Sequence, residues 1–111
     1  MPIKYIRNWE LKSFDDIIDV RSPNEYQEDH IPNSTNLPVL NNLERKEIGK
    51  IYKNKSAFIA KKIGASLISA NIAYHIKKNL LTKPGNWKAL IYCWRGGQRS
   101  KSFATVLSEI G

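Results

Sequence analysis

The sequence of 111 residues holds a single cysteine, Cys93, and only two histidines. One thiol excludes an internal disulfide framework and a site built on several thiolates, so we expect no metal and no resident cofactor. Apolar runs are short, and none approaches the roughly 20 residues that cross a bilayer. The first residues, Met1 to Lys4, lack the apolar stretch of a signal peptide. We therefore expect a cytoplasmic chain without a membrane partner.

The sequence also lacks internal repeats and low-complexity linkers, and its length predicts one domain over residues 1–111. Acidic residues are scarce after residue 34: residues 35–111 carry fourteen basic and three acidic side chains, against four and seven in residues 1–34. A one-sided basic surface attracts polyanions, of which nucleic acid is the commonest large one. Solvated helix faces explain the same lysines equally well.

Hydrophobic patterning predicts an alternation of strands and helices. Buried-strand patterns stand at 17–20 and 89–92, and weaker ones at 3–6 and 35–39. Ser22, Pro23 and Glu25 have the spacing of a capping box that opens a short helix before His30. The remaining predicted elements are a helix from 41 or 42 to about 53 interrupted at Gly49, a helix from 56 to about 80, a turn at 83–86 and a helix at 102–110.

This order predicts an α/β three-layer domain with a mainly parallel sheet. Ligands of such sheets bind outside the carboxyl ends of the strands, and Cys93 directly follows the strand at 89–92. The candidate site is therefore the segment that begins at this cysteine.

The segment after Cys93 has the composition of an anion-binding loop, because a glycine-containing turn before a helix points backbone N–H groups inward. Its residues are Trp94, Arg95, Gly96, Gly97, Gln98, Arg99 and Ser100. Arg99 has a guanidinium that could fork onto an oxyanion, while Arg95 faces either inward or to solvent. These dipoles and charges favour thiolate, so we expect the pKa of Cys93 to lie well below its free value of about 8.5.

Two chemistries suit such a thiolate. It either attacks a sulfur or selenium donor and carries the chalcogen, or attacks phosphorus and forms a thiophosphate. Ser100 is placed to donate a hydrogen bond to the sulfur. The alternative is that Cys93 is a small buried hydrophobe at the end of a strand, as lone cysteines often are.

Three segments resemble the rhodanese domain, and most closely that of the tRNA 2-selenouridine synthases. They are Asp19–Tyr26, His30–Pro38 and the Cys93–Ser100 loop, and the helical insertion at Glu44–Lys53, followed by Ala57, Ala60, Gly64 and Leu67, is the most discriminating addition. The resemblance covers about Ile3 to Gly111. It implies a rhodanese-like fold in which Cys93 is the chalcogen-carrying nucleophile. It also implies tRNA as substrate and selenophosphate or a sulfane-sulfur compound as donor.

Two departures from that family are expected to matter. No P-loop motif is present, so the nucleotide-binding-like domain of the full enzyme is expected in cis or as a separate chain. The rhodanese fold continues with one more strand and helix after the helix at 102–110, so we expect a C-terminally incomplete domain. The strand at 3–6 would then lose its neighbour, and we expect it to be displaced, to pair with another molecule, or to leave the domain with poor stability.

Supporting roles fall to residues near the end of the first buried strand. Asp19 and Arg21 are expected to buttress the active-site loop, and Arg21 and Glu25 have the spacing of an ordinary salt bridge. His30 is interpreted as a turn residue rather than a proton donor. Trp94 either stacks on a base or covers the loop. The candidate tRNA contacts are Lys46, Lys50, Lys53, Lys61 and Lys62.

Two alternative functions remain. Five residues between Cys93 and Arg99 give the loop length of the phosphatases that share the rhodanese fold, which favours a cysteine phosphatase or arsenate-reductase-like enzyme. Against this alternative, Tyr92 stands where those phosphatases place a histidine, and no evident general acid follows the loop. The other alternative is a non-catalytic fragment that binds tRNA or a protein partner.

Overall fold

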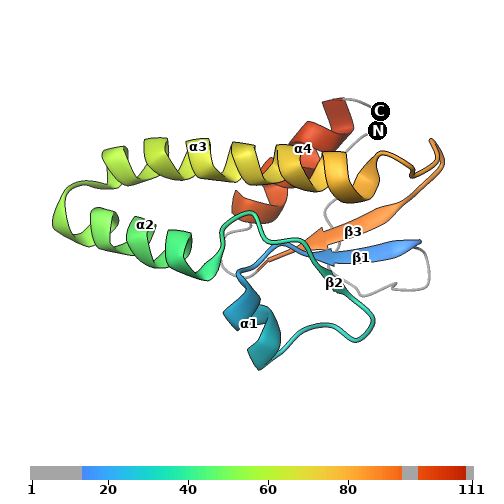
Figure 1. Cartoon of the computed structure of the whole chain (residues 1–111), viewed down its shortest axis with the longest axis horizontal. Coiled ribbons are helices and arrows are strands. Elements are labelled where there is room, and N and C mark those ends of the chain that lie inside the picture. The colour runs from blue at the N-terminus through green and yellow to red at the C-terminus, as the bar shows by residue number, and fades with distance from the viewer. Residues whose placement is uncertain (1–13, 94–97, 110–111) are drawn as a thin grey trace.

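The computed structural model describes residues 14–93 and 98–109 (Figure 1). The strand expected at 3–6, with its predicted displacement, and residues 94–97 of the loop lie outside this range. The elements of the described part are β1 (Asp16–Asp19), α1 (Pro23–Glu28), β2 (Thr35–Asn36), α2 (Asn42–Asn54), α3 (Ala57–His75), the π-helix η2 (Ile76–Leu80), β3 (Ala89–Tyr92) and α4 (Gln98–Glu109). The turn predicted at 83–86 is confirmed by the Trp87 N–H, which donates to Pro84 O.

The three described strands form one parallel sheet in the order β2-β1-β3, which confirms the predicted α/β class. β2 is shorter than the expected strand at 35–39. Its pairing with β1 nevertheless continues, because the Leu37 N–H donates to Asp19 O at 2.9 Å and the Val39 N–H to Val20 O at 3.1 Å. Pro38, which has no N–H, lies between these two donors, where the amide would point away from β1.

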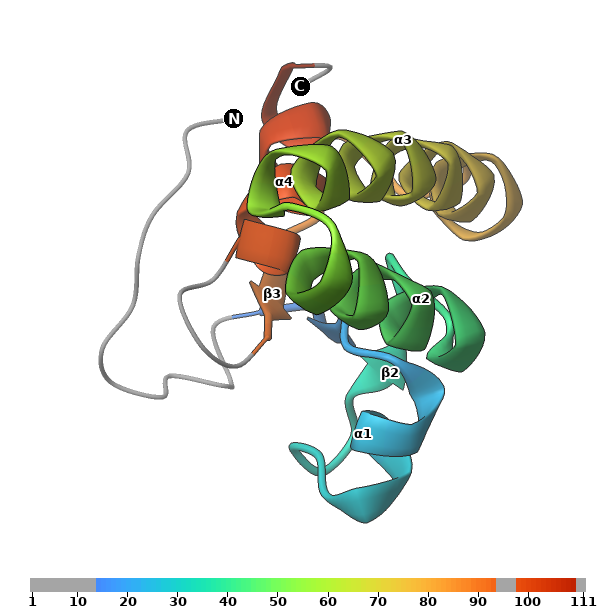
Figure 2. The same cartoon turned by 90° about the vertical axis from the view of Figure 1, so that its left-hand side faces the viewer.

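Helices cover both faces of this small sheet. Figure 2 shows α2, α3 and α4 on one side and α1 on the other. Parallel neighbours need crossover connections of this kind, because a tight turn joins only antiparallel strands. The carboxyl ends of β1 and β3 therefore meet at the same end of the sheet, where Asp19 is the register partner of Tyr92.

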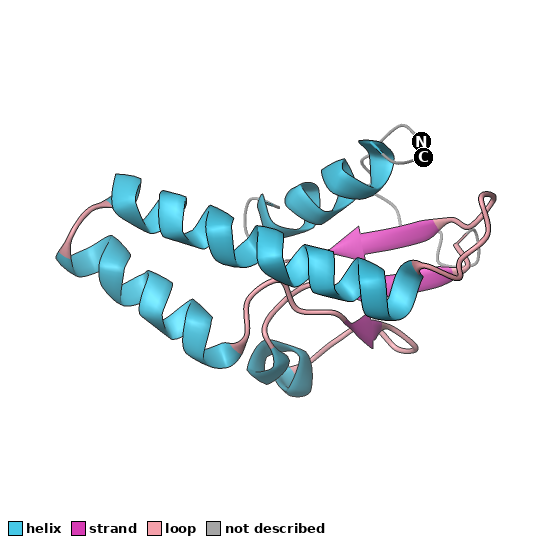
Figure 3. Ribbon diagram, turned by 45° about the horizontal axis from the view of Figure 1, so that its top comes forward, coloured by secondary structure: helices cyan, strands magenta, loops and turns pink. Residues whose placement is uncertain are grey.

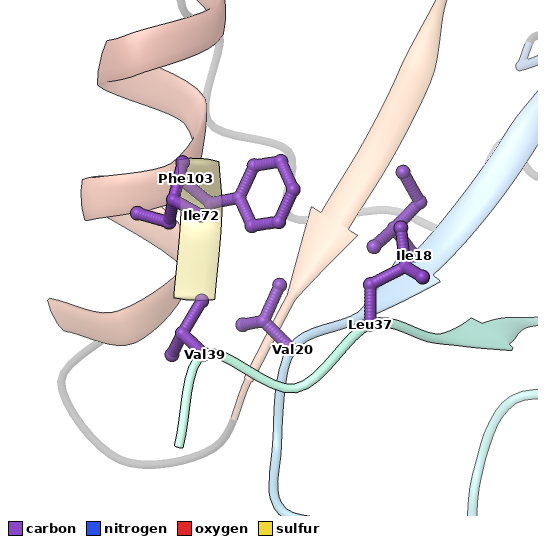
Figure 4. Close-up of a cluster of buried hydrophobic side chains, with 6 residues drawn as sticks. All are labelled: Ile18, Val20, Leu37, Val39, Ile72 and Phe103. Atoms are coloured by element: carbon purple, nitrogen blue, oxygen red, sulfur yellow. The ribbon is translucent and has the colours of Figure 1, made fainter. Parts of the chain in front are cut away.

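The core lies between the sheet and the helices α3 and α4. Figure 4 shows Phe103 of α4 and Ile72 of α3 facing Val20 and Val39, with Ile18 and Leu37 beside them. Phe103 is fully buried. Truncation of a buried phenylalanine to alanine costs about 3–5 kcal/mol, so this contact fixes α4, and with it the residues at its start, against the sheet.

Side-chain caps set the starts of the two longest helices. Asn41 Oδ1 accepts from the Glu44 N–H at 2.7 Å, and Ser56 Oγ accepts from the Ile59 N–H at 3.0 Å, so both helices begin within one residue of the predicted starts. The interruption expected at Gly49 is wrong: α2 runs through it. The cost of a mid-helix glycine, about 1 kcal/mol, is outweighed by the capping and packing of the helix.

The long helix predicted at 56–80 changes geometry near its end. α3 stops at His75, and the π-helix η2 completes the segment. Ile72, Ile76 and Leu80 all pack on the core, and their regular four-residue spacing is wider than an α-helical turn. A wider π-helical turn keeps all three on the core side.

The helices α2 and α3 form a hairpin that extends past the carboxyl ends of the strands (Figure 3). Gly64 of α3 lies against Ile48 of α2. The tip carries exposed apolar side chains, including Tyr52 and Phe58, the latter 70% exposed. No helix in the described ranges is both long and apolar enough to cross a membrane.

Candidate functional site

Cys93 directly follows β3 at the carboxyl end of the sheet, as predicted. It is a free, half-buried thiol, and it donates to Ser100 Oγ at 3.4 Å. In the thiolate form the donor and acceptor exchange, and the hydroxyl becomes the donor. The expected pairing of Ser100 with the sulfur is therefore present in the structure.

The helix α4 begins at Gln98, four residues before the predicted start. Arg99 and Ser100 thus belong to the first turn of a helix rather than to a loop. The sulfur that Ser100 contacts consequently lies near the positive end of the helix dipole. Trp94, Arg95, Gly96 and Gly97 lie outside the described residues, as does the side chain of Gln98, so the backbone nest remains a prediction.

Arg99 makes a forked ion pair with Glu25 of α1. Its Nη1 donates to Glu25 Oε1 at 2.9 Å and its Nη2 to Oε2 at 3.4 Å. Burial raises the pKa of Glu25, but the hydrogen bonds from Arg99 and Ser22 and the charges of Arg99 and Arg45 lower it to about 2. Glu25 is therefore a carboxylate at neutral pH. It holds the guanidinium of Arg99, the residue that precedes Ser100 in α4.

Sequence reasoning missed Arg45 of α2, whose Nε lies 3.0 Å from Glu25 Oε1. No local pattern links the two residues, because they stand on different helices. A second contact joins the same helices: the Asn24 N–H donates to Asn42 Oδ1 at 2.9 Å. The helical insertion is thereby tied to the carboxylate that holds Arg99.

The predicted Arg21–Glu25 salt bridge is wrong. Arg21 instead pairs with Asp19, with Nη2 2.8 Å from Oδ2, and with Asp29. Burial lowers the pKa of Arg21, but Asp19 and Asp29 raise it above its ordinary value on balance. The i, i+4 spacing favoured Glu25, but the extended chain after β1 places Arg21 against the nearer Asp19, and Glu25 faces α4.

Asp19 and Arg21 support the end of β3, the strand that Cys93 follows. The Arg21 guanidinium lies 5.8 Å from the centre of the Tyr92 ring, and the Val20 N–H donates to Tyr92 O at 3.1 Å. The Tyr92 hydroxyl accepts from the Ile31 N–H at 3.0 Å. Burial is the largest cause of a raised pKa at Tyr92, which keeps its hydroxyl protonated.

Neither histidine lies in this cluster. His30 Nδ1 is 2.7 Å from Tyr26 O and its ring stacks on Tyr26, in agreement with its interpretation as a turn residue. His75 is buried in α3, with Nε2 bonded to Pro38 O at 2.6 Å. Over residues 14–93 and 98–109, no three His, Cys, Asp or Glu side chains gather where they could hold a metal ion.

The lysines singled out by sequence all lie on the hairpin, exposed to solvent. They are Lys46, Lys50 and Lys53 on α2 and Lys61 and Lys62 on α3. Lys46, Lys50 and Lys53 have i, i+4, i+7 spacing and therefore share one face of α2. Lys62 Nζ lies 5.4 Å from the centre of the exposed Phe58 ring.

Cys93 follows a strand of a parallel sheet, and the first turn of the next helix carries Arg99 and Ser100. This arrangement is typical of a cysteine-dependent transferase or phosphatase domain. The sequence matches the rhodanese-like domain family over residues 5–111, and the chain belongs to that family. The predicted family and fold class are thereby confirmed.

Two relatives within this family carry the same name. The chain is similar to the tRNA 2-selenouridine synthase of Bdellovibrio bacteriovorus, at 34% identity over 100% of this chain and 31% of that protein. It is also similar to the tRNA 2-selenouridine synthase of Psychromonas ingrahamii, at 36% identity over 86% of this chain and 26% of that protein. The chain thus spans between a quarter and a third of the length of these relatives.

A solved structure shares the fold. The crystal structure of the N-terminal domain of a Clostridium difficile 630 protein, described as ATP/GTP binding, superposes with a TM-score of 0.70. Its sequence is 37% identical, and the match covers 86% of this chain and 74% of that one.

Proposed function

We propose that this domain transfers sulfur or selenium through Cys93 in the modification of tRNA, as part of a 2-selenouridine synthase. The observation that carries the proposal is the contact between the half-buried thiol of Cys93 and Ser100. Arg99, which precedes Ser100, lies in the same helical turn. A rhodanese-like family membership and relatives named tRNA 2-selenouridine synthase support the same chemistry.

Thiosulfate is a sulfane-sulfur donor that suits this transfer step. The Cys93 thiolate attacks its outer sulfur, a new S–S bond forms, and the original S–S bond breaks. The electron pair of the broken bond leaves with sulfite, and Cys93 becomes a persulfide. Arg99 would hold the anionic donor, and the Ser100 hydroxyl would stabilise the attacking sulfur.

The physiological donor is proposed to be selenophosphate, and the final acceptor the wobble 2-thiouridine of tRNA. A P-loop domain, in the same polypeptide or as a separate chain, is the proposed partner. The much greater length of the relatives supports a second domain. We propose no resident cofactor in the domain described here.

The tRNA is proposed to lie along the α2–α3 hairpin, on Lys46, Lys50, Lys53, Lys61 and Lys62. Combined substitution of the three α2 lysines by alanine should reduce the slope of log affinity against log salt by about 2 to 3. Lys77, Lys78 and Lys88, which lie outside the hairpin, provide a control with the same change in charge. Equal slopes for the two triple variants would contradict this placement.

A cysteine phosphatase is the second candidate, favoured by the five residues between Cys93 and Arg99. That loop length can surround a tetrahedral oxyanion, which suits phosphate as well as selenophosphate. Tyr92 argues against it, because it stands where those phosphatases place a histidine, and its hydroxyl accepts from the Ile31 N–H.

Mass spectrometry after incubation with thiosulfate separates these functions. Transfer predicts a gain of about 32 Da, one sulfur atom, that a reductant removes and that Cys93→Ser abolishes. Turnover of an aryl phosphate without any mass gain would instead favour the phosphatase. Salt-dependent tRNA binding with neither reaction would leave a binding module.

A further inference from the structure

The carboxylate of Glu25 lies between two arginines from different helices. Oε1 accepts hydrogen bonds from the Ser22 N–H at 3.2 Å, from the Ser22 hydroxyl at 2.8 Å and from Arg99 at 2.9 Å. The same oxygen lies 3.0 Å from Arg45 Nε. Oε2, by contrast, is contacted by Arg99 at the longer distance of 3.4 Å. Removal of Arg99 would therefore leave Glu25 with two hydrogen bonds and one cation.

The two arginines on Glu25 explain how Arg99 can be paired with a carboxylate and still bind a donor anion. An arginine next to the nucleophile is expected to bind the anionic donor, yet Arg99 is already paired with Glu25 and mostly buried. Freeing a guanidinium from a half-buried carboxylate normally leaves an uncompensated charge, which is strongly unfavourable. Here Arg45 and Ser22 remain on the carboxylate, so Arg99 can leave it at a lower cost.

We propose that Arg45 is a positioning residue that makes Arg99 exchangeable: the donor anion takes the Arg99 guanidinium from Glu25, and Arg45 keeps that carboxylate neutralised. This inference rests on the proposed function, because it concerns the anion that Cys93 attacks. It assigns the helical insertion a role in the site, through the first turn of α2. Arg45 contacts Glu25 and not the reacting atoms, so it acts through Arg99.

The difference in exposure of the two arginines supports this division. The Arg99 side chain is 11% exposed and that of Arg45 43%. The partly solvated Arg45 can follow Glu25 through a small shift, while Arg99 remains at the start of α4 beside Ser100. An anion that binds near Cys93 would therefore pair with Arg99. Glu25, the present partner of Arg99, would keep Arg45 as its second cation.

Protection of Cys93 from alkylation by phosphate tests the proposal without requiring turnover. Cys93 is the single cysteine of the chain, so iodoacetamide labelling reports on it alone. Phosphate replaces chloride at constant ionic strength and pH, and the fall in labelling rate gives an apparent dissociation constant. Arg45→Ala should weaken phosphate protection roughly two- to fivefold, the range of an exposed ion pair. Arg45→Lys should restore most of the affinity.

Two further comparisons separate positioning from a direct or purely electrostatic effect. In a Glu25→Gln background, Arg45→Ala should no longer change the phosphate affinity, because Arg45 acts through that carboxylate. Lys55→Ala, an equal loss of charge at the far end of α2, should leave the affinity unchanged.

Equal protection in the unaltered chain and Arg45→Ala would overturn the proposal. So would an Arg45→Ala effect that persists in the Glu25→Gln background, since Arg45 would then meet the anion itself. Absence of any protection in the unaltered chain would also overturn it, while the gain of one sulfur on Cys93 would still decide the proposed function separately.

Discussion

Two arginine–carboxylate clusters stand near the carboxyl end of the sheet, and they differ in their access to water. The Arg21 and Asp19 side chains are 2% and 0% exposed, whereas Glu25 is 24% exposed and is shared by Arg45 and Arg99. A sealed pair cannot open without leaving a charge in a low-dielectric interior. A partly exposed cluster, in which one carboxylate has two cations, can change partners at a lower cost. The first cluster therefore fixes the strand ends, whereas the second is the one that we propose to bind the donor anion.

The largest effect should follow from breaking the sealed pair. Asp19→Ala leaves the buried Arg21 guanidinium without its main partner, and such a change costs about 3–5 kcal/mol. The free energy of unfolding in urea measures it. A loss below about 1 kcal/mol would show that Asp29 and water can replace Asp19, and the two clusters would then not differ as proposed.

The shared carboxylate should make stability depend on acid. The pKa of Glu25 is about 2 in the folded chain, against 4.5 as its ordinary value. Its contribution is therefore complete above about pH 4.5 and is lost as the pH falls toward 2. We expect a loss of about 2–3 kcal/mol over this window.

Urea unfolding at several pH values checks this expectation, with Glu25→Gln as the control. The variant should be less stable near neutrality and should lose less stability on acidification than the unaltered chain. Parallel pH profiles for the two proteins would contradict the role given to Glu25.

A substitution that keeps the charge should separate the two arginines by function. Arg99→Lys removes the fork that suits an oxyanion and should lower kcat/KM for thiosulfate about ten- to hundredfold, with a small change in stability. Arg21→Lys should instead lower the free energy of unfolding. Steady-state kinetics and urea unfolding of both variants check this contrast between an effect on activity and an effect on stability. If both lost only stability, Arg99 would have no part in donor binding.

The smallest effect is expected at the edge of the sealed cluster. Asp29 is 74% exposed, and its Oδ1 lies 3.3 Å from Arg21 Nη1. Asp29→Ala should cost less than about 1 kcal/mol, because solvent-exposed partners contribute little. Thermal and urea unfolding would detect a larger loss, and such a loss would mean that Arg21 depends on both acids.

Local patterns allowed much of the fold to be predicted. The strand at 89–92 has the predicted bounds. The helices α2 and α3 begin within one residue of the predicted starts, because a single polar side chain, Asn41 or Ser56, can reach the amides of the next turn. The early start of α4 and the π-helix η2 were missed. Both depend on packing against the sheet, which a helical repeat in the sequence does not contain.

Only those contacts of the site that join residues close in sequence were predictable. Cys93 and Ser100 are close in sequence, and their contact was expected. The partners of Glu25 were not, because Arg99 is 74 residues away and Arg45 lies on another helix. Sequence spacing alone favoured Arg21. Tertiary structure, rather than helical periodicity, decides which cation a carboxylate meets.

The most direct test is a crystal structure of Cys93→Ser with thiosulfate, in which the donor binds but sulfur cannot be transferred to a thiolate. We expect an anion next to the start of α4, with the Arg99 guanidinium turned onto it. Arg45 and Ser22 should remain on Glu25, and Arg21 should remain on Asp19. Thiosulfate bound elsewhere, with Arg99 still forked onto Glu25, would show that Arg99 does not exchange Glu25 for the donor.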